Sequence, residues 1–157
     1  MEKMIESIKE LFAENEWKYS FHEKDKVFVS GVNMGNVIGD VRMLVFMEET
    51  AYTVYMILNS KAEEKNYSAV SEFLHRANYG LKDGNFEIDY SDGEIRYKTF
   101  VNFANTSMSK DVVEESMFIG AVMIEKYGKG LLKVMLGQGI PEKCIEECEE
   151  GDGGEEE

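Results

Sequence analysis

Three segments of the chain carry apolar residues at helical spacing. In the first, residues 1–12, apolar positions recur every three or four residues between Glu and Lys, which predicts an amphipathic helix ending near Asn15. The second helix is predicted to begin at residues 60–63, Ser-Lys-Ala-Glu, which fit a capping box, and to end at residues 78–80. A third, long helix follows Ser109, a suitable N-terminal cap.

Between these helices, runs of β-branched and aromatic residues predict strands. Residues 17–21 alternate between aromatic and polar side chains, and a second strand starts at residues 27–29. Residues 37–47 and 51–58 are longer and are separated only by Glu-Glu-Thr. This short separation is typical of two antiparallel strands joined by a hairpin.

A further hairpin is predicted in residues 85–98. Asp92-Gly93 suits the two central positions of a type I′ turn, because both positions need positive φ. With that turn, apolar residues meet apolar residues and both acids meet bases: Tyr90 faces Ile95, Asp89 faces Arg96, Ile88 faces Tyr97 and Glu87 faces Lys98.

The predicted order of elements is therefore α-β-β-β-β-α-β-β-α. Consecutive strands joined by short turns pair antiparallel, and an amphipathic helix must bury its apolar side. The pattern predicts an α+β fold in which helices pack on one face of an antiparallel sheet.

Two segments are more apolar than a single buried face requires. Residues 43–47 are continuously apolar, which indicates a strand covered by helices on one face and by a second chain on the other. The last helix is apolar nearly all round. The candidate interface for a homodimer or another protein therefore comprises Met43, Val45, Met47, Phe118, Val122 and Met123. Ordinary core packing explains each of these residues equally well.

Charge narrows the choice of partners. The chain has 157 residues, a length typical of one domain, and a net charge of −14, with nine acids and one Lys between residues 142 and 157. No cluster of Lys and Arg is present, so nucleic acid and anionic membranes are not expected partners. We expect one domain over residues 1–141 and an acidic, largely disordered tail over 142–157. The charged N-terminus resembles neither a signal nor a transit peptide, which places the protein in the cytoplasm.

The residues that usually carry chemistry are sparse. Cys144 and Cys148 would share one helix face, but a structural zinc site needs four ligands, and the histidines, His22 and His75, are distant in sequence. The glycines near residues 31–39 lack the Gly-Lys-Ser/Thr ending of a phosphate loop. We expect no enzyme activity, no cofactor and no metal site.

Three stretches resemble the YbjN-like family: EWKYSFHEKDKVFVSGV, FLHRANYGLKDGNFEIDYSDGEIRYKTFVNF and GQGIPEKCIEE. The resemblance covers about residues 4–148, and the acidic, cysteine-containing tail departs from it. This family is described as bacterial sensory-transduction regulators with a type III secretion chaperone-like fold. The resemblance implies an α+β domain and a regulatory or adaptor role, often as a dimer, and supplies no catalytic residues. The residues that carry it best are Asn78, Tyr79, Gly84, Asn85, Phe86, Gly93 and Arg96.

Two functions follow as hypotheses. The first is a non-enzymatic regulatory or chaperone-like adaptor that binds a segment of another protein, as a homodimer. The second is a ligand-sensing regulator that holds a small molecule between the sheet and the helices.

Overall fold

The computed structural model describes residues 1–150. Its helices and strands follow the order predicted from the sequence, with one helix added at the end. The elements are α1 (Glu2–Glu14), β1 (Tyr19–His22), β2 (Val27–Asn33), β3 (Asp40–Met47), β4 (Ala51–Leu58), the short 3-10 helix η1 (Glu64–Asn66), α2 (Tyr67–Tyr79), β5 (Asn85–Ile88), β6 (Ile95–Asn102), α3 (Lys110–Met135) and α4 (Pro141–Glu150).

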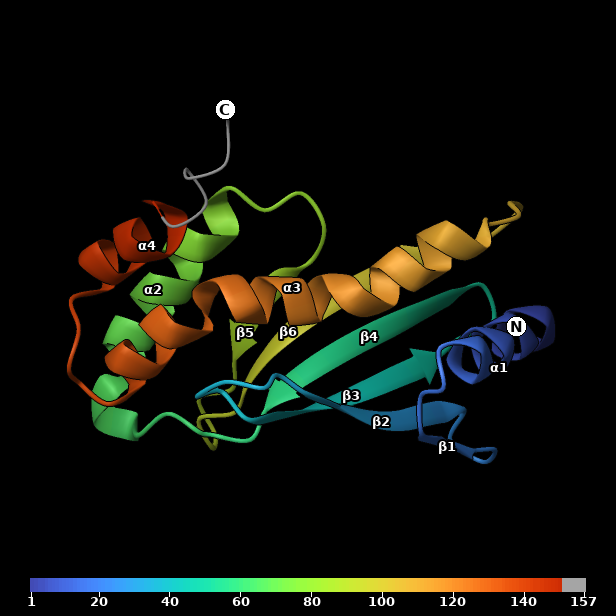
Figure 1. Cartoon of the computed structure of the whole chain (residues 1–157), viewed down its shortest axis with the longest axis horizontal. Coiled ribbons are helices and arrows are strands. Elements are labelled where there is room, and N and C mark those ends of the chain that lie inside the picture. Colours follow the sequence, from blue (N-terminus) through green and yellow to red (C-terminus); the bar gives the residue numbers. More distant parts are fainter. Residues whose placement is uncertain (151–157) are drawn as a thin grey trace.

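The strands form a single antiparallel sheet in the order β1-β2-β3-β4-β6-β5. Helix α3 lies across β4 and β6, α2 packs beside β5, and α1 covers the other end of the sheet (Figure 1). In β3, alternate residues point toward the helices and are buried, as the period of two requires, whereas central strand β4 is buried on both faces at seven of its eight positions. The α+β fold with helices on one face is confirmed.

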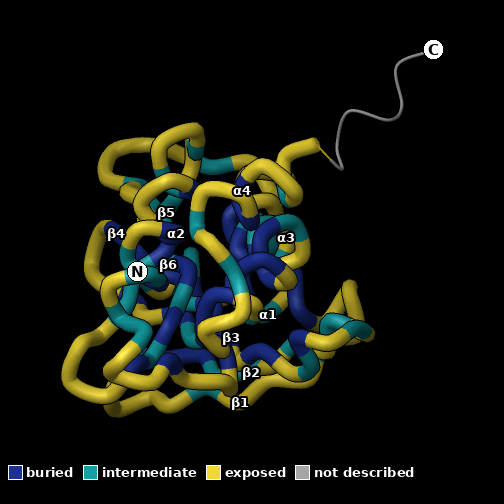
Figure 2. The backbone as a smooth tube through the Cα atoms, turned by 90° about the vertical axis from the view of Figure 1, so that its left-hand side faces the viewer, coloured by how far each residue is buried: buried dark blue, intermediate teal, exposed yellow. Residues whose placement is uncertain are grey.

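The core lies between the sheet and the helices, and Figure 2 shows the buried positions gathered there. At the end nearest α1, Phe28 and Phe12 are fully buried, with ring centroids 5.6 Å apart. At the centre, Gly120 of α3 passes so close to Met56 that a Cβ would lie 2.7 Å from its Cγ. Within residues 1–150, no helix combines the length and the apolarity needed to cross a bilayer.

The C-terminal boundary of the domain differs from the prediction. Pro141–Glu150 forms helix α4, which packs on α2 and α3 and buries Cys144 and Ile145. The expectation of a disordered tail from residue 142 is therefore wrong for residues 142–150; residues 151–157 lie outside the described part. Charge dominates this segment's composition, yet its few apolar residues share one helix face, and that face is sufficient for packing.

The β5–β6 hairpin has a different register from the predicted one. Glu87 lies opposite Arg96, and Ile88 lies opposite Ile95. The turn contains four residues instead of two, because the backbone of Asp89 and Glu94 closes it and the Asp89 carboxylate accepts the amide of Ser91. The shift is by two residues, so each side chain keeps its predicted face.

The predicted start of the second helix also needs correction. Helix α2 starts at Tyr67 without a side-chain cap, because residues 60–63 instead contact the hairpin turn, where the Ala62 amide donates to the Gly93 carbonyl (2.9 Å). Helix α3 runs without interruption from Lys110 to Met135. Its N-terminal cap is as predicted: Ser109 Oγ accepts the amide of Val112 at 3.3 Å.

Candidate functional site

Three of the six predicted interface residues belong to the core. Met43 and Val45 are 1% and 0% exposed and Met47 is 7% exposed, because all three point toward the helices. They are unavailable to a second chain, and their assignment to an interface is wrong. A run of apolar residues does not show which alternate positions point inward, and the sequence prediction chose the inward set.

The other three predicted residues lie on α3 and separate into different environments. Phe118 is half-buried, with its ring centroid 4.2 Å from that of Trp17. Val122 is exposed, and Met123 is half-buried on the side of α3 that faces Leu81 and Tyr97. The three residues therefore do not all lie in one patch, because Met123 and Phe118 contact different parts of the fold.

The sheet face opposite the helices carries apolar side chains that sequence reasoning missed. We call it the outer sheet face and define its apolar residues as Val29, Leu44, Phe46, Tyr55 and Phe100. Phe46 and Phe100 are 39% and 58% exposed, and both flank Thr53 of β4, which lies directly between them. The alternation of positions 44 and 46 with 43, 45 and 47 was the signal that could have revealed this face.

The aromatic residues of the outer sheet face contact one another and a cation. Phe46 and Tyr55 meet edge to face, with ring centroids 5.7 Å apart. The Arg96 guanidinium lies over the Tyr55 ring at 4.1 Å. These contacts restrict the rotamers of the long side chains that make them.

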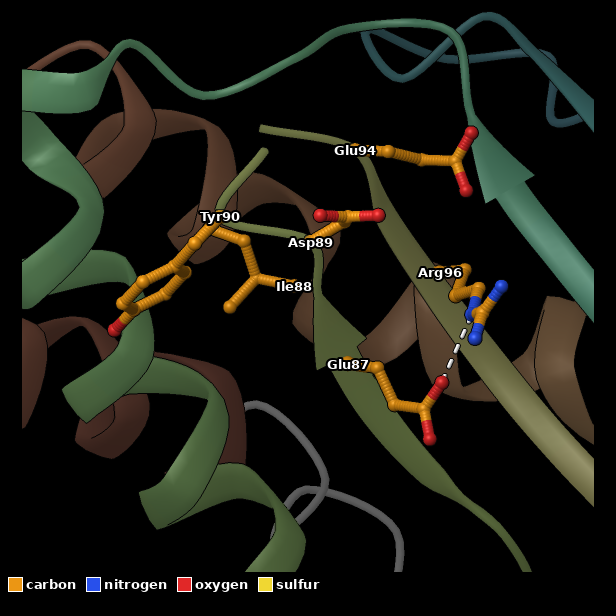
Figure 3. A pocket seen from close by; sticks show the side chains of 6 residues that line it. All are labelled: Glu87, Ile88, Asp89, Tyr90, Glu94 and Arg96. Atoms are coloured by element: carbon orange, nitrogen blue, oxygen red, sulfur yellow. Dashed lines mark hydrogen bonds and ion pairs between the residues drawn. The ribbon is translucent and has the colours of Figure 1, made fainter. Parts of the chain in front are cut away.

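A charged hollow of about 570 Å³ borders the outer sheet face at the β5–β6 hairpin. In Figure 3, Ile88 and Tyr90 point away from the side that carries Glu87 and Arg96. Arg96 donates to Glu87 at 2.8 Å, and Lys98 forms a second ion pair with the same carboxylate. Burial opposes ionisation of Glu87, but the bonds from Lys98 and Arg96 outweigh it and hold the pKa below its usual value.

The charged side chains around this hollow form ion pairs that largely neutralise one another. Arg42 adds a longer pair with Glu94, at 3.8 Å. Tyr90 is held by α2, where its ring stacks on Tyr67 and its hydroxyl meets that of Ser71. The arrangement gives the outer sheet face a charged border.

The cysteines and histidines do not converge. Cys144 and Cys148 share the inner face of α4, and burial, followed by nearby charges, raises the pKa of both thiols. His22 and His75 are exposed on β1 and α2. Across residues 1–150, no three His, Cys, Asp or Glu side chains are grouped to hold a metal ion.

Tyr97 supplies a pH-dependent prediction. Its hydroxyl donates to the Asp83 carbonyl, and burial, with the nearby Asp83 charge, raises the pKa of Tyr97 to about 12. The unfolded chain has an ordinary tyrosine pKa near 10, so it loses this proton first. Stability should fall by about 2 kcal/mol between pH 10 and 12 through this residue.

Urea unfolding of wild type and Tyr97→Phe across that pH range checks the prediction. The difference in stability between the two proteins should shrink as pH rises, because only the wild type has this hydroxyl to ionise. Curves that stay parallel would contradict a raised pKa at Tyr97.

Comparison with known proteins supports the fold. No family model and no curated protein matches the sequence. Among solved structures, YbjN from E. coli, named as a proposed transcription regulator, is similar with a TM-score of 0.58 and 9% identity, over 80% of this chain and 91% of that one. An uncharacterized protein from Methanothermobacter thermautotrophicus is similar with a TM-score of 0.50 and 13% identity, over 85% of this chain and 96% of that one. The chain therefore has a YbjN-like fold.

Proposed function

We propose that this protein is a non-enzymatic regulatory adaptor that binds other polypeptides and works as a homodimer. The observation that carries the proposal is the outer sheet face, where Phe46 and Phe100 are exposed beside the half-buried Leu44 and Tyr55. An apolar face bordered by charged side chains is typical of a protein-interaction surface. The regulatory part of the proposal rests on the likeness to YbjN, which carries that description.

A second copy of the chain fits the outer sheet face by charge. The whole chain carries −14, so two copies repel each other over most of their surfaces. On the outer sheet face the charges are nearly balanced: Arg42, Arg96 and Lys98 lie among Asp40, Glu87, Asp89 and Glu94. Two copies can therefore meet here without strong repulsion, and a two-fold axis would place each apolar row against its equivalent.

Phe46→Glu is the variant that tests the homodimer. Phe46 is 39% exposed in the single chain, so the fold tolerates the change, whereas a carboxylate buried in the dimer lacks a partner. Sedimentation equilibrium should show a wild-type dimer, and the variant should raise the dimer dissociation constant by about tenfold or more.

The matched control is Tyr79→Glu, an aromatic-to-acid change at a residue 94% exposed on α2. It should leave the dimer intact. A wild-type protein that sediments as a monomer at about 100 µM would contradict the dimer, since regulatory interfaces of standard size reach that affinity. A metabolite pool that raises the melting temperature of such a monomer would favour the small-molecule sensor instead.

A further inference from the structure

Strand β6 extends four residues beyond its partner at one edge. β6 spans Ile95–Asn102, but β5 pairs only with its first half, ending at Asn85 opposite Lys98. At Gly84 the chain lies tight against β6, where a Cβ would be 2.5 Å from the Lys98 carbonyl oxygen. No described strand lies opposite residues 99–102 on this side, although β4 pairs with them on the other.

The backbone pattern shows which groups are unpaired. The Phe103 amide donates to the Thr50 carbonyl, so the backbone amides and carbonyls of the odd-numbered β6 residues point toward β4. The Asp89 amide donates to the Glu94 carbonyl, so the backbone groups of the even-numbered residues point toward β5. Phe100 and Asn102 therefore point their amides and carbonyls to the open side. Within residues 1–150 no backbone or side-chain hydrogen bond satisfies them.

The neighbouring edge, on β5, is protected in the way that sheet edges usually are. The outward amide of Phe86 donates to the Asn78 side chain at 2.7 Å, and the Asn78 amide donates back to the Phe86 carbonyl at 3.0 Å. One side chain of α2 thus takes the place of a further strand. Among residues 1–150 no side chain covers the open part of β6 in this way, and an unprotected edge is a template for strand addition.

A groove runs beside this open edge, between β6 and α3. It contains hollows of about 280 Å³ and 410 Å³. We call it the β6–α3 groove and define its apolar lining as Val101, Met108, Val112, Ile119 and Met123. A strand added to β6 would direct alternate side chains into this groove, because the side chains of Thr99 and Val101 on β6 already point to that face of the sheet.

Charge indicates the kind of segment that fits. The carboxylates of Asp83 and Glu115 are exposed at the hollow that borders Thr99 and Val112, whose described lining contains no Lys or Arg; Lys82 and Lys126 line the other hollow, with Glu149. Among the described residues neither carboxylate takes part in an ion pair or a side-chain hydrogen bond. Lys or Arg on a bound segment could therefore form ion pairs with these two carboxylates. A second copy of this chain, docked through the same edge, would instead place its own Asp83 and Glu115 near these acids, and the like charges would repel.

We propose that the open edge of β6 and the β6–α3 groove bind an extended segment of a partner protein, with apolar side chains in the groove flanked by Lys or Arg. The segment adds antiparallel to β6, in line with β5, and pairs with Phe100 and Asn102. This inference rests on the proposed adaptor function and names the class of partner and its site.

A short peptide tests the proposal directly. The probe is the acetylated and amidated octapeptide Lys-Thr-Val-Thr-Val-Thr-Lys-Thr, and its counterpart carries Glu in place of both Lys. In NMR titrations of the full chain, the Lys peptide at up to about 1 mM should shift the amides of Phe100 and Asn102 and slow their hydrogen exchange about tenfold or more. The Glu peptide should bind at least about tenfold more weakly.

Methylated peptides distinguish strand addition from simple apolar contact. Threonines opposite Phe100 and Asn102 direct their amides to β6, whereas the valine amides point away. N-methylation of the threonines should abolish binding, and N-methylation of the valines should leave it nearly unchanged. Equal effects of both changes, or no binding by the Lys peptide, would overturn the proposal.

Two variants of the same residue type on the same helix complete the test. Val112 lines the groove and is 47% exposed, while Val122 is 53% exposed and lies outside it. Val112→Glu should weaken the Lys-peptide interaction at least about tenfold in affinity, since an acid replaces part of the apolar wall. Val122→Glu should have no effect, and an equal loss in both variants would place the peptide elsewhere.

Sedimentation of the same samples separates the two proposals. A dimer that binds no peptide would overturn the groove proposal alone. A monomer that binds the Lys peptide at Phe100 and Asn102 would support the groove and contradict the homodimer.

Discussion

A chain that ends at Gly139 is expected to unfold with a free energy about 4 kcal/mol lower than a chain that ends at Glu150, because α4 buries apolar side chains worth roughly 1.5 to 3 kcal/mol each. Cys144 and Ile145 are 3% and 8% exposed in the intact fold. Their removal also exposes the parts of α2 and α3 against which α4 packs.

The close approach of α4 to α3 is the second reason for a large effect. A Cβ on Gly130 would lie 2.7 Å from Cys148 Sγ and 3.0 Å from the Cys144 carbonyl oxygen, so the two helices meet almost backbone to backbone. Polar contacts reinforce them, including the bond from the Tyr127 hydroxyl to Glu149 at 3.1 Å.

Urea denaturation of the two truncated chains measures this difference. Because both lack residues 151–157, the comparison isolates α4 and the linker before it. Equal midpoints and slopes for the two chains would show that α4 contributes nothing and would restore the sequence prediction of an independent acidic tail.

Gly93→Ala is expected to destabilise the fold by about 3 kcal/mol. Part of this loss comes from placing alanine at a positive φ, and part from the steric overlap of its Cβ with a neighbouring residue. Gly93 has φ +76°, and a Cβ there would overlap the carbonyl oxygen of Ala62. The substitution would also break the hydrogen bond that the Ala62 amide donates to the Gly93 carbonyl, together with the ion pair between Lys61 and Asp92. Thermal or urea unfolding gives the value.

Gly80→Ala is the control for this prediction. Gly80 has φ −97°, and no atom of the described residues lies within 4 Å of the Cβ it would gain. Alanine there should change stability by less than about 1 kcal/mol. If Gly93→Ala proved equally mild, the contact between the hairpin turn and residues 60–63 would not be important to the fold.

The order of elements was predictable because it depends on local periodicity. The spacing of Ile5, Ile8 and Leu11 defines a helix in any context, and the β-branched and aromatic run at residues 51–58 defines a strand. Ser109 also caps its helix through a bond to a residue three positions away, which needs no distant partner.

The predictions that failed depended on distant residues. The capping box at residues 60–63 was a valid local signal, but Lys61 and Ala62 contact the hairpin turn about thirty positions away. Because of this contact, helix α2 begins only at Tyr67. The hairpin register failed for a related reason. Tyr90 packs against Tyr67 of α2, so it leaves the strand and lengthens the turn.

The candidate site shows the same division. The sequence indicated more apolar surface than one layer needs, but it could not distinguish Met43 from Leu44, since both belong to one apolar run. Only the packing of the helices on one face of the sheet assigned the odd positions to the core and left Phe46 exposed. The open edge of β6 was also invisible in the sequence, because it arises from the unequal lengths of two paired strands.

By itself the sequence determined the α+β class, the order of strands and helices as far as α3 and the acidic character of the chain, because these follow from periods of 2 and 3.6 residues and from composition. The tertiary structure decided which side of the sheet is covered, where the domain ends and which backbone groups stay unpaired. Those features depend on contacts between residues far apart in the chain, and such contacts form only when the layers pack.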